Sequence, residues 1–182
     1  RLSSGAVNRN ITGITLDMAL IDQQAKGFLK SVTAAVKRVD LIINMAGNLV
    51  VEDFMKFSTG KAREMMEVNF FGPASLIRTL RPLMKKGSHI VNISSMGGYQ
   101  GSSKYRGLSY YSSSKAAIAC LSECLAEEFR DSGISVNCLA LGAVETGMFK
   151  EAFPGHKAPV TPEEMAEFIA GFAIDGSRYF NG

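Results

Sequence analysis

The sequence predicts an α/β protein built on a doubly wound parallel sheet with helices on both faces. From Ile11 onward, short apolar runs alternate with longer segments of helical periodicity, which is typical of βα units that feed a parallel sheet. The run Leu41-Ile42-Ile43 is apolar at three consecutive positions, as expected of a strand buried on both faces. Small and polar residues follow the predicted strands, where an open parallel sheet binds its ligands.

Composition favours one ordinary globular domain spanning residues 1–182. The chain has 182 residues, of which 46% are hydrophobic and 20% are charged, so it can bury a sizeable core. Its 20 basic and 17 acidic residues leave a net charge of +3 and are scattered, so neither nucleic acid nor a membrane is an expected partner. The three cysteines match neither a disulfide framework nor a CxxC pair, and we therefore expect a cytoplasmic location.

The first half of the chain contains two predicted strands and two predicted helices. Residues 11–16 form the first strand candidate, and a helix with apolar residues at three- and four-residue spacing covers 25–36. Residues 40–44 form the second strand. A longer helix covers 58–83, and either of its first two residues can cap it. We expect it to be interrupted at the residues that fit helix interiors poorly, Asn69, Gly72 and Pro73.

The second half continues the same alternation. A strand over 89–93 ends at Ser94 and Ser95, before a glycine-rich loop. A long helix over 109–131 follows, and Ser132-Gly133 closes it. Its apolar stripe consists of Ile118, Leu121, Leu125 and Phe129. Then come a strand over 134–141, a long loop over 142–160 and a last helix, which Thr161-Pro162-Glu163-Glu164 opens with a cap, a proline and early acids.

Tyr111 and Lys115 are the residues that most directly suggest chemistry. They are four apart at the start of the long helix, so their side chains share one face. A lysine ammonium beside a phenol favours the phenolate and lowers its pKa, which makes Tyr111 a candidate general acid. Tyr110 competes less well, because the residue four positions further on is Ser114, which carries no charge. The pair also follows a strand that ends in Ser95, which places three polar groups at one sheet edge.

Five segments of the chain, taken in order, resemble the short-chain dehydrogenases/reductases. These are Asp40-Leu41-Ile42-Ile43-Asn44-Met45-Ala46-Gly47, Val68-Asn69, Ile90-Val91-Asn92-Ile93-Ser94-Ser95, Tyr111-Ser112-Ser113-Ser114-Lys115, and Val136-Asn137 with Leu141-Gly142-Ala143-Val144-Glu145-Thr146. The resemblance implies a Rossmann-type sheet and an oxidoreductase that interconverts a carbonyl and a secondary alcohol by hydride transfer, with NADP or NAD as cofactor. It also implies a small-molecule substrate and a homodimer or homotetramer.

The resemblance implies a catalytic role for four residues. Tyr111 would donate and accept the proton, while Lys115 would depress the pKa of Tyr111 and bind the nicotinamide ribose. Ser95 would hold the substrate oxygen. Asn69 would hold a water against Lys115, although the same residue is also explained if the helix simply breaks there and restarts at Pro73.

The resemblance also implies the residues that contact the cofactor. Asn44, Ala46 and Gly47 would form the wall around its adenosine half, and Asp17 would lie near the adenine, although Asp17 could instead cap the following helix. Val144 and Thr146 would hold the nicotinamide carboxamide, in a segment that begins at Gly142. No metal is expected, because the two histidines, His89 and His156, lack the spacing of a metal site.

The chain departs from the family pattern in ways that affect the cofactor site. Met45 stands where the family has a second Asn, Leu141 stands where it usually has Pro, and the loop after Ser95 is enlarged. No glycine-rich phosphate loop precedes Ile11, and the last family strand is expected only after Gly182. We therefore expect the domain to be incomplete at both ends, with the strand candidate at 11–16 lacking a neighbour. The alternative to an enzyme is a non-catalytic nucleotide- or partner-binding protein, or an inactive fragment.

Overall fold

Three parallel strands form the sheet of the computed structural model, which describes residues 11–182. β1 (Leu41–Asn44), β2 (His89–Ser95) and β3 (Ser135–Leu141) lie in that order. Ile42, Ile90 and Val136 are aligned across the three strands and are buried in the core. Because the strands are parallel, their carboxyl ends meet at one edge. The parallel sheet of the sequence prediction is confirmed.

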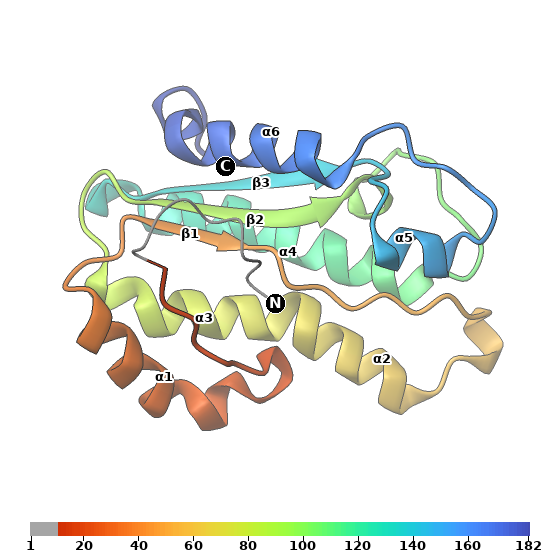
Figure 1. Cartoon of the computed structure of the whole chain (residues 1–182), viewed down its shortest axis with the longest axis horizontal. Helices are drawn as coiled ribbons and strands as arrows, with labels where there is room; N and C mark the ends of the chain where they lie inside the picture. Colours follow the sequence, from red (N-terminus) through yellow and green to blue (C-terminus); the bar gives the residue numbers. More distant parts are fainter. Residues whose placement is uncertain (1–10) are drawn as a thin grey trace.

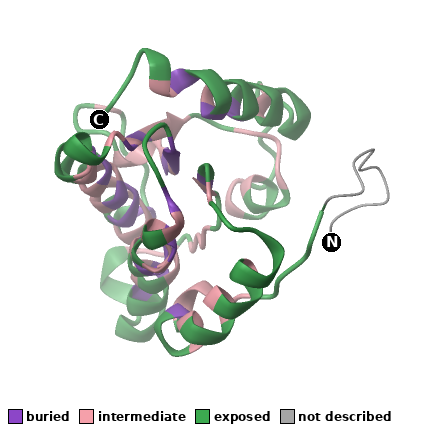
Figure 2. Cartoon of the chain, turned by 90° about the vertical axis from the view of Figure 1, so that its left-hand side faces the viewer, coloured by how far each residue is buried: buried purple, intermediate pink, exposed green. Residues whose placement is uncertain are grey.

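Helices cover both faces of this sheet (Figure 1). α1 (Ile21–Ala35), α3 (Gly72–Leu80) and α4 (Ser109–Glu128) lie on one face, and α6 (Pro162–Asp175) lies on the other. Apolar side chains of α1, α3 and α4 belong to the hydrophobic core or pack against it. Figure 2 colours the buried residues of the chain purple. α2 (Thr59–Met66) precedes α3 along the chain. The predicted arrangement of helices on both faces is therefore confirmed.

The long helix predicted over 58–83 does not break at Asn69. Ser58 caps α2 by accepting a hydrogen bond from the Lys61 amide. The chain then passes through one π-helical turn, Glu67–Phe71, directly into α3. Pro73 closely follows the π-helical turn and lies at the start of α3. Gly72 is required by close packing, since a Cβ there would lie 2.6 Å from the Met18 carbonyl oxygen.

The local signals at the later helix ends are confirmed. Gly133 adopts a left-handed conformation with φ of +65° and ends the turn that follows α4. Thr161 forms a reciprocal capping box with Glu164 at the start of α6, and Pro162 occupies the first turn. The predicted apolar stripe of α4 also packs as expected, with Ile118 buried and Leu125 against the core.

Two predicted elements differ from the structure. Residues 11–16 are not a strand: they are mostly exposed, and within residues 11–182 β1 pairs only with β2. A parallel strand needs a neighbour to satisfy its backbone groups, and this segment has none among the described residues. The predicted loop 142–160 contains a short helix, α5 (Gly147–Ala152), and a bridge between Val144 and Val160 closes it.

His89 links α6 to the sheet through hydrogen bonds of its side chain. Its imidazole is buried in β2, where Nδ1 lies 2.9 Å from the Ala173 carbonyl oxygen and Nε2 lies 2.9 Å from the Asn137 side-chain nitrogen. This arrangement fits a neutral ring that donates from Nδ1 and accepts at Nε2. Burial lowers the pKa of His89, which favours that neutral form. His89 is therefore a structural residue.

No helix within residues 11–182 combines the length and the apolar character needed to cross a membrane. The carboxyl ends of the strands, the segment between β1 and α2, and α5 all lie at the same end of the molecule, on the right in Figure 1. The residues singled out in the sequence therefore gather at this end.

Candidate active site

Tyr111 and Lys115 meet on the inner face of α4. Lys115 is only 5% exposed, and its Nζ lies 5.9 Å from the centre of the Tyr111 ring. The same ammonium donates a 2.9 Å hydrogen bond to the Ile93 carbonyl oxygen, near the end of β2. The helical spacing therefore brings the two side chains together as predicted, and it holds the cation beneath the sheet edge.

Burial, rather than the lysine charge, dominates the pKa of Tyr111. Loss of water raises the pKa of the phenol above its usual value, and the neighbouring Ser95 hydroxyl opposes this rise. Burial likewise lowers the pKa of Lys115, because a low-dielectric site disfavours every charged form. The expected depression of the Tyr111 pKa is therefore wrong for the described residues. Tyr111 is held as a neutral phenol that can donate a proton.

Ser95 places a hydroxyl at the same edge. It is the last residue of β2 and pairs with Leu141 at the end of β3. Its Oγ accepts a hydrogen bond of 3.2 Å from the Gly97 amide, which leaves the hydroxyl proton to be donated elsewhere. Ser95 is half-buried, so a ligand at the edge can reach it.

The π-helical turn directs Asn69 into the same region. Asn69 is 1% exposed: its Oδ1 accepts from the Asn48 amide at 2.7 Å, and its Nδ2 donates to the Asn48 carbonyl at 2.8 Å. The Nδ2 group also donates to Ser114 Oγ at 2.9 Å. A Cβ on Gly47 would lie 3.6 Å from both Asn69 Oδ1 and Lys115 Nζ. Three sequence-predicted residues therefore converge at one point.

The sequence reasoning missed two serines that position the pair on α4. Ser114 is fully buried and donates a 2.7 Å hydrogen bond to the Tyr111 carbonyl, so it links Asn69 to the backbone of Tyr111. Its position three residues after Tyr111 is a signal that could have predicted this bond. Ser94 donates to the Lys115 carbonyl at 2.6 Å. No local pattern distinguishes Ser94 from any other serine at a strand end.

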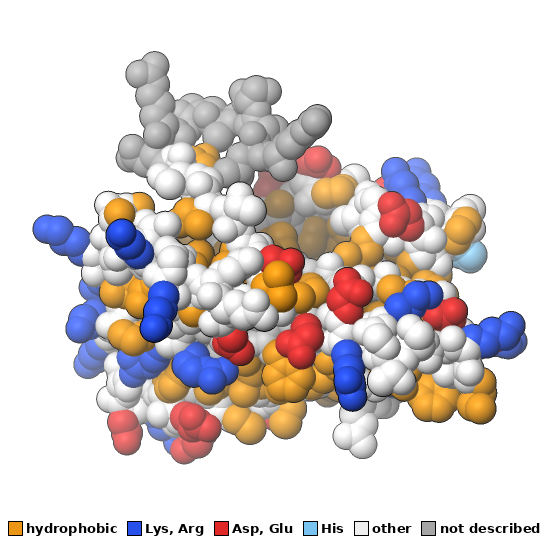
Figure 3. Space-filling model, turned by 90° about the horizontal axis from the view of Figure 1, so that it is seen from below, with side chains coloured by type: hydrophobic (Ala, Val, Ile, Leu, Met, Phe, Trp, Pro, Cys, Tyr) orange, Lys and Arg blue, Asp and Glu red, His pale blue; other side chains and the backbone are white. Residues whose placement is uncertain are grey.

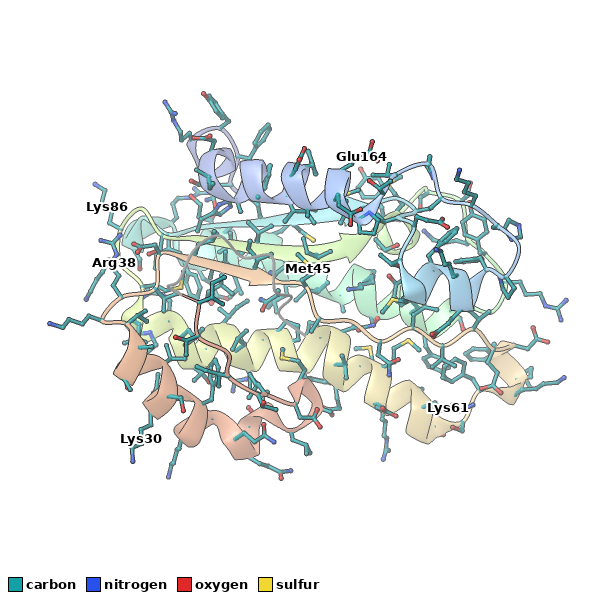
Figure 4. All side chains as sticks on the ribbon, in the orientation of Figure 1. Lys30, Arg38, Met45, Lys61, Lys86 and Glu164 are labelled. Atoms are coloured by element: carbon teal, nitrogen blue, oxygen red, sulfur yellow. The ribbon has the colours of Figure 1, made fainter. Side chains whose placement is uncertain are left out.

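Asn44 and the residues after it differ in how far their side chains are exposed at the carboxyl edge of the sheet. The Asn44 side chain turns inward, where its Nδ2 donates to Asn92 Oδ1 at 2.7 Å and its Oδ1 is buried without a partner among the described residues. The side-chain amide of Asn44 is therefore held inside the fold, and the place of this residue in the cofactor wall stays a prediction. Ala46 is exposed and Gly47 half-buried. Met45 is 57% exposed at the end of β1 (Figure 4).

The remaining cofactor candidates lie at loops and helix ends. Asp17 accepts a 2.9 Å hydrogen bond from the Ala19 amide and caps the turn Met18–Leu20, so the capping alternative is confirmed. Thr146 caps α5 by accepting from the Phe149 amide at 3.2 Å. Val144 lies in the bridge to Val160, and Gly142 is exposed with open space where a Cβ would stand.

Comparisons with known proteins bear on this site. A family model described as short chain dehydrogenase matches residues 3–157. The chain is 33% identical over 160 residues to a fatty acyl-CoA reductase of Acinetobacter baylyi, covering 84% of this chain and 51% of that protein. It is 29% identical over 189 residues to a 3-oxoacyl-[acyl-carrier-protein] reductase of Chlamydia trachomatis, covering 94% of this chain and 74% of the other. The chain thus spans about half the length of the first of these relatives.

Solved structures agree with the fold. A short chain dehydrogenase from Salmonella enterica serovar Typhi matches with a TM-score of 0.82 at 25% identity, over 92% of this chain and 70% of the other. A short chain dehydrogenase from Burkholderia cenocepacia, solved in complex with NADP, matches with a TM-score of 0.79 at 19% identity, over 90% of this chain and 70% of the other.

Proposed function

This chain belongs to the short chain dehydrogenase family. From that premise we propose that it acts as an NAD(P)-dependent oxidoreductase, which interconverts a carbonyl compound and a secondary alcohol. The observation that carries the proposal is the convergence of Ser95, Tyr111 and Lys115 at the carboxyl edge of the sheet. Both named relatives are reductases, which supports a carbonyl substrate. Small-molecule chemistry also suits an edge site in an open parallel sheet.

Tyr111 acts as the general acid and base in this proposal. Its raised pKa keeps the phenol protonated at neutral pH, as a donor to a carbonyl oxygen must be. Ser95 donates a hydrogen bond to the same oxygen while negative charge develops there. The two hydroxyl groups are close enough for Ser95 to influence the Tyr111 pKa, so one substrate oxygen can meet both.

Lys115 binds the nicotinamide ribose. An ammonium has three donors, and within residues 11–182 its one hydrogen bond is to Ile93, so two N–H groups fit ribose hydroxyls. When bound, NADP or NAD supplies the hydride, the step that no side chain can provide. Asn69 holds a water against Lys115, a role that its position beside Gly47 supports. Its amide is already bonded to Asn48 and Ser114, so it binds that water through remaining acceptor capacity.

We place the cofactor along the edge residues. Gly47 and Ala46 border its adenosine half with the Asn44 backbone, and Asp17, which also caps the turn Met18–Leu20, lies towards the adenine. Gly142, Val144 and Thr146 contact the nicotinamide end. The open space at Gly142 supports this placement, because a flat ring needs close access to the backbone. The NADP in the Burkholderia structure supports the choice of cofactor.

The proposal extends to location and assembly. All three cysteines are free thiols, which supports a reducing, cytoplasmic location. We place a homodimer or homotetramer contact on the Asn69 and Tyr111 helices. Phe71 is 48% exposed there, and hydrophobic side chains reach the surface between charged ones on the face seen from below (Figure 3). Light scattering on the purified protein tests the assembly.

Substitution of Tyr111 by Phe tests the enzyme proposal. Tyr110→Phe is the matched control, because the Tyr110 ring packs against the Phe57 ring, with 4.8 Å between the ring centres. We expect Tyr111→Phe to lower kcat/KM by about 10²- to 10⁴-fold and Tyr110→Phe to change it by less than about threefold. Cofactor binding, followed by fluorescence, should survive in both. If the cofactor binds but Tyr111→Phe leaves every observed activity unchanged, the proposed catalytic role of Tyr111 fails.

A further inference from the structure

Glu145 connects the two ends of the loop that runs from β3 to α6. This residue lies between Val144 and Thr146, in the segment placed at the nicotinamide end of the cofactor. One carboxylate oxygen, Oε2, accepts a 2.7 Å hydrogen bond from the Ala158 amide. The other, Oε1, lies 3.5 Å from Nζ of Lys150 in α5. A single side chain therefore joins the start of the loop both to α5 and to the end of the loop.

The surroundings of Glu145 favour an ionised carboxylate. The side chain is half-buried. The hydrogen bond from the Ala158 amide lowers the pKa of Glu145, and the charges of Lys150 and Lys157 act in the same direction. Hydrogen bonds to a charged acceptor are stronger than those between neutral groups. The carboxylate is therefore charged at neutral pH and binds both partners at once.

The backbone holds only the base of this loop. Val144 forms a bridge with Val160, and the Glu145 amide donates a 2.9 Å hydrogen bond to the Val160 carbonyl oxygen. Both contacts persist whatever side chain stands at position 145. The carboxylate reaches further into the loop, to Lys150 and to Ala158, which is buried. The side chain therefore fixes a part of the loop that the bridge does not.

The outer end of α5 has a weaker restraint. The ring of Phe153, which follows α5, lies edge-on to the ring of Tyr105, with 6.4 Å between the ring centres. Tyr105 belongs to the enlarged loop after Ser95 and is 62% exposed. A contact at this distance between partly exposed rings restrains a helix less than a charged hydrogen bond does. The position of α5 relative to the sheet edge therefore depends mainly on Glu145.

We propose that Glu145 is a positioning residue, which keeps Val144 and Thr146 where they contact the nicotinamide. This inference rests on the proposed function. When the loop opens, these two residues are displaced, and the apparent affinity for the cofactor falls in proportion to the fraction of molecules that remain competent to bind it. Glu145 acts through the loop and does not touch the reacting atoms.

Glu145→Ala removes both contacts, and Glu151→Ala is the matched control, because Glu151 is an exposed carboxylate of the same helix. Hydrogen exchange of the cofactor-free protein is measured by mass spectrometry on peptides that cover 147–158. Exchange should be roughly tenfold or more faster in Glu145→Ala and unchanged in Glu151→Ala. The affinity for NADPH or NADH, followed by cofactor fluorescence, should fall by roughly 10- to 100-fold in Glu145→Ala alone.

Conservative variants separate positioning from a general loss of structure. Glu145→Gln keeps an acceptor for the Ala158 amide but loses the charge that faces Lys150, so it should restore part of the affinity that Glu145→Ala loses. Lys150→Met should reproduce the effect of Glu145→Gln and add nothing to it in the double variant. Circular dichroism establishes that each variant is folded.

Three outcomes contradict the inference. Equal exchange of the loop in Glu145→Ala and the wild type overturns it, and so does faster exchange with an unchanged affinity for the cofactor. Failure of the wild type to bind either cofactor refutes the proposed function together with this inference. Normal binding by both the wild type and Glu145→Ala refutes this inference alone.

Discussion

Replacing Asn69 by Ala tests whether the π-helical turn is held by this one side chain. Asn69 makes three hydrogen bonds while almost wholly buried: two with the backbone of Asn48 and one with Ser114. The substitution removes all three of these hydrogen bonds. Ser114 keeps its bond to the Tyr111 carbonyl, whereas the Asn48 N–H and C=O are only half-buried, so water can satisfy them in part.

The expected loss follows from these contacts. A buried polar group without its partner costs about 1–3 kcal/mol, and partial access of water lowers that cost for each Asn48 group. Two such groups and the lost side-chain volume together give about 2–4 kcal/mol. Ser114→Ala removes fewer contacts and should cost about 1 kcal/mol. The double variant should show a coupling of roughly 0.5–1.5 kcal/mol, because the two residues are in direct contact.

Urea unfolding of the wild type and the three variants, followed by circular dichroism and tyrosine fluorescence, measures these free energies of unfolding. With a slope of about 2 kcal/mol per molar, Asn69→Ala should lower the midpoint by roughly 1–2 M. A change below about 0.5 kcal/mol for Asn69→Ala would refute the reasoning, since it would show that the turn is held by other contacts. The comparison of midpoints requires that the dependence of the free energy of unfolding on urea concentration is the same in the wild type and the variants.

Three further predictions concern packing, pH and capping. Gly98 ends the turn Met96–Gly98 that follows β2. A Cβ there would lie 2.6 Å from the Lys115 carbonyl carbon, so Gly98→Ala should displace this turn from α4, cost about 1–3 kcal/mol in urea unfolding and lower kcat/KM. Burial lowers the pKa of His89, so the unfolded chain binds that proton more readily. The free energy of unfolding should therefore hold above about pH 6.5 and fall as the pH drops below it, with a weaker dependence in His89→Gln. Thr161→Ala removes the hydroxyl that caps α6 through Glu164 and should cost about 1 kcal/mol, or roughly 2–4 °C in Tm by calorimetry.

Matched variants control these tests. Gly142→Ala adds a methyl group in open space and should leave stability within about 0.5 kcal/mol. If it destabilises as much as Gly98→Ala, close contact is not the cause. His156 is exposed, so His156→Gln should keep the wild-type pH dependence. An equal effect of the two histidine variants would contradict the role given to His89, and an unchanged Tm in Thr161→Ala would contradict the cap.

The sequence could predict features that depend on near neighbours in the chain. The pairing of Tyr111 with Lys115 follows from the helical repeat. The ends of α6 and of the turn after α4 follow from Thr161, Pro162 and Gly133, whose backbone preferences act locally. The position of Ser95 at the end of β2 could be predicted from the sequence, because the apolar run of that strand ends just before it. Each of these signals spans about four residues.

The structure was needed where the deciding contact joins distant residues. Asn69 meets Ser114 across 45 positions and Asn44 meets Asn92 across 48, so neither the unbroken helix nor the inward amide could be predicted from local patterns. The strand candidate at 11–16 failed for the same reason, since a strand is defined by its neighbour.

The sequence by itself therefore determined the three strands of the sheet, the long helices beside them, the caps, and the meeting of Tyr111 with Lys115, because these depend on backbone geometry and short-range periodicity. Only the tertiary structure decided the protonation preference of Tyr111, since burial by the whole fold outweighs one lysine four residues away. It also decided the course of the chain through Asn69, because hydrogen bonds from Asn48 and Ser114 stabilise a turn that local propensity disfavours.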